Sequence, residues 1–323
     1  MGLETLRLNS AVVECLKAQA GARLTARQVA AWIRDRYPDE CEAKLARSQS
    51  LQNEADLLQQ LVAEIGANRP KIEQKYSQVR TTEDRPRLYY WSNATEEAEV
   101  IDAEGSKDAF IDEVSVVVNV STPIRLVETP PREVALYPKL AEYLSVEFGL
   151  HAQRIDEKRS ANKRGPQGNR WLYPDLVALE DLTLDWTPEV RNCVSEAGAQ
   201  KARLWSFEVK LLLNRSNVRE AYFQTVSNSS WANFAYLVTG ELEGPDTLKE
   251  LRMLAALHGI GLIKLDSENP AESQIFIPAR ERPEIDWANC NPLASENTDF
   301  QKVVTLLWQF HRTGDARPGE WRA

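Results

Sequence analysis

The segment 204–213 constrains this chain more than any other, because it sets two charged residues in the middle of an apolar run. It reads LWSFEVKLLL and is apolar on both alternating faces, which is typical of a strand buried on both sides. Glu208 and Lys210 stand two residues apart, so they share one face of that strand. A carboxylate buried without a partner is costly, so such groups are paired, neutralised or bound to a metal ion.

A second acid stands at the head of another apolar run. Asp175 follows Pro174 and precedes the run 176–179, which is close enough in sequence to form a strand beside 204–213. If both strands are buried at this point, Asp175 and Glu208 can hold a divalent cation, with Lys210 beside it as a mobile charge. If the strand ends fray there, Glu208 and Lys210 are simply solvated. The sequence leaves both interpretations open.

The rest of the carboxy-terminal pattern alternates between helices and strands. The spacing of apolar residues predicts helices at 133–148, 216–231 and 245–257, and strands at 234–238 and 260–265. Ser216 and Asn217 are both suitable N-caps for the second of these helices. Together with the two strands above, this order favours an α/β fold in which a mixed sheet is flanked by helices.

Pro174-Asp175, followed by an apolar strand with the triplet Glu208-Val209-Lys210 and then a helix and another strand, resembles the PD-(D/E)XK nuclease superfamily. The resemblance implies a restriction-endonuclease-like fold in which Asp175 and Glu208 bind Mg²⁺ or Mn²⁺. The carbonyl of Val209 is a further candidate ligand, and no soft ligand is present to favour another metal. Lys210 is then expected to orient or activate the attacking water, because phosphodiester hydrolysis needs charge neutralisation and a supplied hydroxide.

Two helices carry further candidates for this site. The superfamily often has an acid on its first core helix, which implies Glu133 or Glu142, although either can be a solvated helix residue. Glu220 and Gln224 are four residues apart on the next helix and therefore share a face. The resemblance to nucleases with a glutamine on this helix implies that Gln224 is a catalytic residue facing the scissile bond.

A basic stretch precedes Asp175. The residues 154–170 include two glycines and a proline, which indicate a loop, and we expect this loop to contact phosphates beside the site. A solvated loop is the alternative. Its predicted DNA-binding residues are Lys158, Arg159, Lys163 and Arg164. Between the two acidic motifs, 181–201 has mixed polarity and is predicted to be an insertion, longer than a tight hairpin needs.

The amino-terminal part has its own pattern. Amphipathic spacing predicts helices at 11–18, 24–33 and 54–65, with Thr25 as the cap of the second. Residues 72–79 and 87–91 are predicted to be two strands around a turn. This plan resembles a winged helix-turn-helix domain of the kind fused to defence and restriction proteins, which implies DNA contact. Its predicted DNA-binding residues are Arg69, Lys71, Lys75, Arg85 and Arg87. A protein-interaction module is the alternative.

Length and composition limit the number of domains and the kinds of function that are possible. The 323 residues are enough for two domains, and we expect a winged-helix domain at 1–93, a linker at 94–125 and a nuclease domain with a C-terminal helical tail at 126–323. The net charge of -9 means that DNA binding must rely on local basic patches. Four scattered cysteines and three histidines argue against a zinc module or a Ser-His-Asp enzyme. Without a signal peptide or a long apolar run, we expect a cytoplasmic protein with no membrane partner.

As a whole, the chain resembles the HrgA-like group of bacterial proteins, which is associated with restriction-modification. The leading hypothesis is a metal-dependent DNA endonuclease in restriction or anti-phage defence, in which the winged helix positions DNA. The competing hypothesis is a non-catalytic DNA-binding or regulatory protein that uses the nuclease fold as a scaffold. The expected partners are DNA and restriction-modification or defence proteins, and cutting both strands with one site per chain argues for a homodimer.

Overall fold

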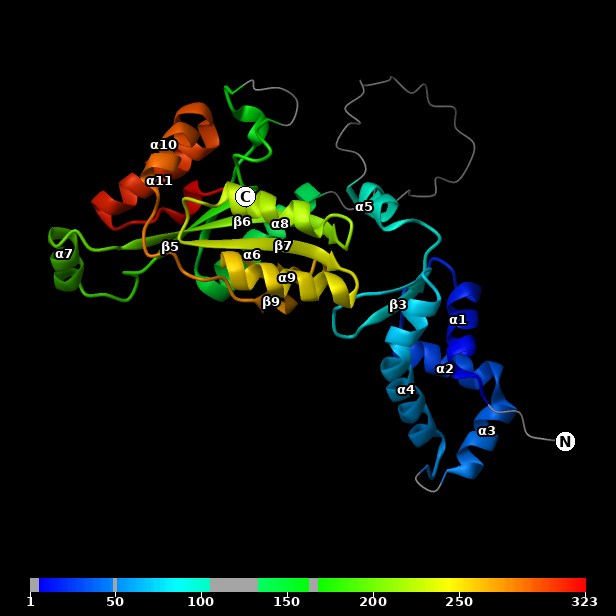
Figure 1. Ribbon diagram of the computed structural model, residues 1–323. Coiled ribbons are helices and arrows are strands. Elements are labelled where there is room, and N and C mark those ends of the chain that lie inside the picture. The colour runs from blue at the N-terminus through cyan, green and yellow to red at the C-terminus, as the bar shows by residue number, and fades with distance from the viewer. Residues whose placement is uncertain (1–5, 49–50, 105–132, 163–167) are drawn as a thin grey trace, which may run out of the picture. The chain divides into compact units, whose positions relative to one another are not determined.

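A computed structural model of the chain describes residues 6–48, 51–104, 133–162 and 168–323 (Figure 1). These residues divide into two units. The first unit is Met1–Glu99 with Leu242–Leu248, and the second unit is Val100–Glu241 with Lys249–Ala323. The start of the predicted linker at 94–125 contains a helix, α5 (Glu96–Glu104), and its remainder lies outside the described residues.

The first unit combines helices with a small sheet. Its helices are α1 (Leu8–Ala18), α2 (Ala26–Arg36), α3 (Pro38–Arg47) and α4 (Glu54–Lys75). Its strands β1 (Leu24–Thr25), β2 (Val79–Thr81) and β3 (Leu88–Trp91) form an antiparallel sheet in the order β1-β3-β2. Thr25 begins α2 with a capping box, in which its side chain and that of Gln28 each bond the other's backbone N–H. The predicted cap is therefore confirmed.

Three features of the first unit differ from the sequence prediction. The helix predicted at 24–33 begins two residues late, because Leu24 and Thr25 form β1 and α2 starts at Ala26. The predicted strand at 72–79 is wrong except at its last residue, because residues 72–75 form the last turn of α4, residues 76–78 connect the two elements, and β2 begins only at Val79. Ile72 continues the buried stripe of Leu61 and Ile65, so packing extends the helix past Pro70. The short helix α3, which begins with Pro38 at its first turn, was not predicted.

The second unit is built on a six-stranded mixed sheet in the order β4-β5-β6-β7-β8-β9 (Figure 1). The strands are β4 (His151–Arg154), β5 (Leu176–Asp181), β6 (Ala202–Leu213), β7 (Phe234–Leu242), β8 (Gly261–Lys264) and β9 (Gln274–Ile277). β4, β5 and β6 are antiparallel neighbours, β7 and β8 run parallel, and β9 is antiparallel to β8. The expected mixed sheet is present, and the edge strand β9 is an element that the sequence did not indicate.

Helices cover this sheet and its ends. They are α6 (Leu136–Phe148), which follows the 3-10 turn η1 (Glu133–Ala135), then α7 (Pro188–Glu196), α8 (Val218–Asn228), α9 (Pro245–His258), α10 (Trp287–Glu296) and α11 (Thr298–Thr313). The predicted helices at 133–148 and 216–231 are present with shorter ends, the one at 245–257 is one residue longer, and the helical tail is present as α10 and α11. None of the helices in the described part of the chain is both long enough and apolar enough to span a membrane.

The two faces of β5 show how the core is arranged. Leu176 and Ala178 pack with the apolar side of α6, whereas Val177 and Leu179 pack with residues of α10 and α11. This alternation follows from the two-residue period of a strand. Nearly every residue of β6 is buried, so its predicted burial on both faces is confirmed.

The insertion at 181–201 does not separate the two motif strands. β5 and β6 are antiparallel neighbours with Leu176 opposite Phe207 and Asp181 opposite Ala202. The inserted residues lie beyond the paired region and include α7, none of whose residues is buried. Strand pairing is therefore set by the buried apolar residues, and the long connection only changes what lies past the end of the hairpin.

The first unit contains a buried acid, Glu243, bonded to the hydroxyl of Tyr90. Burial raises the pKa of Glu243 to about 7, and the charge of Glu99 acts in the same direction, while the Tyr90 hydroxyl and the charges of Arg23 and Arg80 oppose it. The folded protein thus holds the proton of Glu243 more tightly than the unfolded chain does. This preference stabilises the fold most at low pH, and the stabilisation is lost as the pH rises through about 7.

We expect Glu243→Gln to remove this part of the pH dependence. Relative to the variant, the native protein should lose up to about 3 kcal/mol of its free energy of unfolding between pH 4.5 and pH 8. Urea unfolding at several pH values measures the difference. The exposed Glu97→Gln serves as the control, and an equal response of both variants would contradict the assignment.

Candidate active site

The register of β5 and β6 brings the two predicted metal-binding acids together. Leu176 pairs with Phe207, so one further step along the hairpin places Asp175 opposite Glu208 on the same face. The backbone supports this step, because the N–H of Asp175 donates to the carbonyl of Phe207 at 3.0 Å. The Asp175 carboxylate in turn accepts from the N–H of Val209, with 2.7 Å between Val209 N and Asp175 Oδ2. Both halves of the motif therefore share one hydrogen-bonded frame.

Glu208 and Lys210 form an ion pair inside the second unit. Both residues are only 2% exposed, and Lys210 Nζ lies 2.6 Å from Glu208 Oε1. Lys210 Nζ also donates to the main-chain carbonyl of Val209 at 3.2 Å. The interpretation that these two residues are solvated at a frayed strand end is wrong, because β6 is covered on both faces here.

A third acid reaches the site from the start of α6. Glu133 is buried in η1, and the hydroxyl of Tyr137 lies 3.0 Å from Glu133 Oε1 and 3.0 Å from Asp175 Oδ1. A single hydroxyl proton can be donated fully to only one of these oxygens, so the second contact favours a proton on a carboxyl group. Of the two acids considered on this helix, Glu133 lies at the site and Glu142 is exposed.

The electrostatics of the site follow from three acids around one lysine. Burial raises the pKa of Asp175 well above its ordinary value, and the charges of Glu208 and Glu133 add to the shift. Burial also raises the pKa of Glu208, against the opposing effect of Lys210. For Lys210 burial acts to lower the pKa, but the three acids outweigh it and the pKa is raised. The lysine is thus held as an ammonium, whereas Asp175 and Glu208 bind protons more readily than exposed carboxylates do.

Helix α8 contributes side chains that bond Glu208 and Arg170. Gln224 is buried and donates from Nε2 to the carbonyl of Arg170 at 3.1 Å, and Glu220 on the same face pairs with the Arg170 guanidinium at 3.0 Å. Asn228, one turn beyond Gln224, donates from Nδ2 to Glu208 Oε2 at 2.9 Å. The helix face that contains Gln224 therefore adjoins both motif strands.

The sequence analysis missed two residues of this arrangement. Tyr137 follows Glu133 by four residues and Asn228 follows Gln224 by four, so each lies one helical turn from a residue that was named. That spacing is the signal that could have indicated them. Tyr137 and Asn228 are neither acids nor lysines, and the sequence pattern of the motif names only those residue types.

The oxygen atoms at the site suit a hard divalent cation. Asp175 and Glu208 offer carboxylates, and Val209 offers a main-chain carbonyl, which is the type of donor set that Mg²⁺ completes with water or a phosphate. Within the described residues, no three His, Cys, Asp or Glu side chains are grouped to hold an ion by themselves. A cation here would therefore depend on non-side-chain oxygens for the rest of its coordination.

Two of the four basic residues predicted near the site lie among the described residues. Lys158 and Arg159 lie on the surface at the short turn η2 (Glu157–Arg159), and Arg159 forms an ion pair with the buried Asp299 at 2.5 Å. Lys163 and Arg164 lie outside the described residues. Arg159 is therefore engaged within the unit, and DNA contact by this stretch stays a prediction.

The basic residues predicted on the first unit divide into two groups. Arg69 and Arg87 both pair with Glu83, at 2.8 Å and 3.0 Å. Lys71, Lys75 and Arg85 are exposed to solvent. The charge that this unit presents outwards is thus smaller than the sequence suggests, because an internal acid neutralises part of it.

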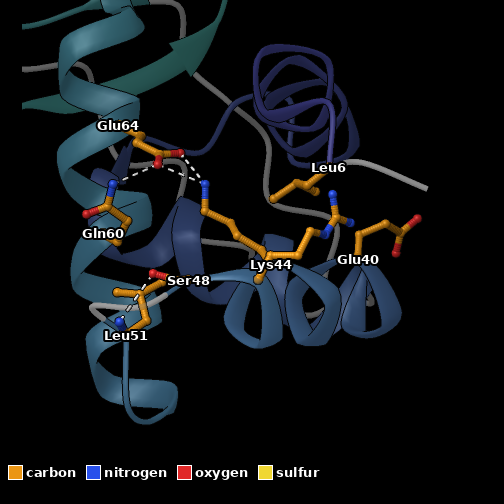
Figure 2. Close-up of a pocket in the computed structure, with 8 residues that line it drawn as sticks. Leu6, Glu40, Lys44, Ser48, Leu51, Gln60 and Glu64 are labelled. Carbon is orange, nitrogen blue, oxygen red and sulfur yellow. Dashed lines mark hydrogen bonds and ion pairs between the residues drawn. The ribbon is translucent and has the colours of Figure 1, made fainter. Parts of the chain in front are cut away.

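Figure 2 shows a pocket of about 280 Å³ between α3 and α4 of the first unit. The Lys44 side chain lines it, and Lys44 Nζ bonds both carboxylate oxygens of Glu64, at 2.8 and 2.7 Å. Its lining contains two acids and two bases, so its charge favours neither an anion nor a cation. The lining residues are Leu6, Glu40, Lys44, Arg47, Ser48, Leu51, Gln60 and Glu64.

Comparison of the chain with protein-family models, with characterised proteins and with solved structures found no significant match. The geometry of the residues is therefore the only support for the function proposed below.

We expect Lys210→Met to destabilise the protein by roughly 3–5 kcal/mol, because it removes the lysine that pairs with Glu208 and leaves this buried acid without that partner. The double variant Glu208→Gln/Lys210→Met should recover part of this loss, since the buried charge of Glu208 is then absent, whereas Asp175 and Glu133 still lack the lysine. Urea unfolding of the full chain measures both free energies. Lys302→Met is the matched control, because Lys302 bonds the neutral Gln153 at 2.8 Å. A similar loss in both lysine variants would contradict the role of the ion pair.

Proposed function

We propose that this protein is a metal-dependent DNA endonuclease whose hydrolytic site lies in the second unit. One observation carries the proposal: Asp175, Glu208 and Lys210 meet around the backbone of Val209, with Lys210 Nζ 2.6 Å from Glu208 Oε1 and 3.2 Å from the Val209 carbonyl. Three acids around one lysine in a buried site are an arrangement that favours added positive charge.

Asp175, Glu208 and the Val209 carbonyl are the proposed ligands of Mg²⁺ or Mn²⁺. A bound divalent cation supplies charge neutralisation for the phosphate and lowers the pKa of water to provide a nucleophile. Asp175 is fixed for this role by the Val209 N–H and the Tyr137 hydroxyl, and Glu208 by Lys210 and Asn228. Preorganised ligands of this kind cost little to arrange when the ion and the substrate bind.

The remaining residues have distinct roles in the proposal. Lys210 keeps its proton, because the surrounding acids raise its pKa, so it orients the attacking water and stabilises charge instead of removing a proton. Glu133 and Asp175 share the Tyr137 hydroxyl, and burial raises the pKa of Asp175, so Asp175 holds a proton more readily than an exposed carboxylate does. Gln224 on α8 bonds the carbonyl of Arg170, in the segment that leads into Asp175, and stays a predicted catalytic residue.

The first unit is proposed to be a winged helix that positions DNA through Lys71, Lys75 and Arg85. Their exposure supports this role, whereas Arg69 and Arg87 are engaged by Glu83. Restriction or anti-phage defence, and action as a homodimer, belong to the same proposal, since one hydrolytic site per chain would cut one strand at a time.

A non-catalytic DNA-binding protein is the second candidate. The observation that favours it is the complete pairing of Glu208, whose two carboxylate oxygens are bonded to Lys210 and Asn228. Such a cluster can be retained as a structural element without an ion. The two candidates differ in one measurable property, which is hydrolysis.

Purified protein is therefore expected to cleave supercoiled plasmid with Mg²⁺ or Mn²⁺ and to be inactive with EDTA. Glu208→Gln and Lys210→Met should each reduce the cleavage rate by about a thousandfold or more, because they remove a ligand and the charge that stabilises the transition state. Glu142→Gln changes an exposed acid of α6 and should cleave normally. Cleavage that survives Glu208→Gln would overturn the site, and no cleavage of any nucleic acid with either metal would favour the non-catalytic candidate.

DNA affinity is expected to depend on the exposed cations of the first unit. Replacing Lys71, Lys75 and Arg85 together with alanine should reduce the slope of log affinity against log salt by about 3, if each neutralises one phosphate. Replacing Arg69 and Arg87 with glutamine is the control, since Glu83 already binds both. Fluorescence anisotropy over a range of salt concentrations measures the slopes. An unchanged slope in the triple variant would rule out this surface.

A further inference from the structure

Three side chains of α8 hold the chain that leads into Asp175. Gln224 Nε2 donates to the carbonyl of Arg170 at 3.1 Å, and Ser227 Oγ donates to the carbonyl of Trp171 at 2.7 Å. Asn228 Nδ2 lies 2.8 Å from the carbonyl of Tyr173 and 3.1 Å from that of Arg170. The helix thus fixes the backbone immediately before Pro174-Asp175, and we name residues 170–173 the entry segment.

Asn228 differs from the other two because it also reaches the opposite motif strand. Its Nδ2 donates to Glu208 Oε2 at 2.9 Å, and the residue is only 1% exposed. One amide group therefore contacts both the entry segment of Asp175 and the carboxylate of Glu208. No other side chain in the described residues is recorded with hydrogen bonds to both.

The atoms around the Asn228 side chain fix which end of its amide faces the site. Three acceptor oxygens surround Nδ2, from Glu208, Tyr173 and Arg170, whereas Oδ1 accepts no hydrogen bond from the described residues. The reverse orientation would set the amide oxygen against three other oxygens, which repel it. An alanine would leave Glu208 Oε2 and the Tyr173 carbonyl without this donor, whereas Gln224 would still bond the carbonyl of Arg170. Glu208 would then be held by Lys210 alone, through its other carboxylate oxygen.

We infer that Asn228 is a positioning residue that sets the separation of the Asp175 and Glu208 carboxylates, and thereby the affinity of the site for a divalent cation. The inference rests on the proposed function in that it takes these two acids as the metal ligands. Asn228 acts through Glu208 and does not itself contact the ion. Residues that orient a metal ligand in this way affect affinity by about 10- to 100-fold.

The test is Mn²⁺ binding to the full chain, measured by calorimetry without nucleic acid. Asn228→Ala should weaken binding by about 10- to 100-fold while the fold is retained, as judged by circular dichroism and urea unfolding. Asn233→Ala is the matched control: Asn233 is also fully buried and joins two segments through the N–H of Leu204 and the carbonyl of Arg282, each at 2.9 Å, but it does not contact the acids. It should lower stability and leave Mn²⁺ affinity within about twofold.

Two further variants keep the test decisive. Ser227→Ala loosens the entry segment without touching Glu208, so it should retain Mn²⁺ affinity. If Asn228→Ala does not fold, Asn228→Ser replaces it, and the same loss of affinity is expected because a hydroxyl cannot reach Glu208 and both carbonyls. Native affinity in a folded Asn228 variant, or an equal loss in Asn233→Ala, overturns the inference.

The outcomes for the two proposals can be separated. Mn²⁺ binding that depends on Asn228, in a protein that cleaves no nucleic acid, would support the inference and contradict the proposed function. Cleavage that depends on Glu208, with Asn228→Ala binding Mn²⁺ normally, would support the proposed function and contradict the inference. A native protein that binds no divalent cation would overturn both.

Discussion

The ion pair between Glu208 and Lys210 is the interaction on which the proposed site depends. Both residues lie on a strand covered on its two faces, and each is only 2% exposed. Such a pair seldom adds stability over apolar residues of the same size, because desolvation offsets the attraction between the charges. A strand that retains it, beside the further acids Asp175 and Glu133, is better explained by chemistry at this point than by folding alone.

The arrangement around this pair also explains how a fold with long connections can hold a precise site. β5 and β6 are adjacent, and the inserted helix α7 lies past the paired region, so the register of the hairpin places Asp175 opposite Glu208. Side chains from α6 and α8 then fix the two carboxylates from different directions, through Tyr137 and Asn228. The strands determine which residues meet, and the helices determine how their oxygens are oriented.

The sequence was sufficient for the parts of this architecture that depend on local pattern. Burial of β6, the order of helices and strands from Glu208 to β8, and the cap at Thr25 all follow from periodicity or from a short hydrogen-bonding motif. The sequence was not sufficient where tertiary packing determines where an element ends or which residue reaches the site. The last turn of α4 forms because Ile72 is buried, and Glu133 was distinguishable from Glu142 only once α6 was placed on the sheet. Charge was the least predictable property, since the pairing of Arg69 and Arg87 with Glu83 depends on contacts between elements.

The central claim is that Asp175, Glu208 and the Val209 carbonyl bind a divalent cation. Crystals grown or soaked with Mn²⁺ test it most directly, because the anomalous signal of manganese locates the ion without assumptions about activity. The account predicts an anomalous peak within about 2.5 Å of oxygen atoms from both carboxylates, and none in crystals of Glu208→Gln. Well-ordered Asp175 and Glu208 without a peak between them, or manganese bound only elsewhere on the protein, would contradict it.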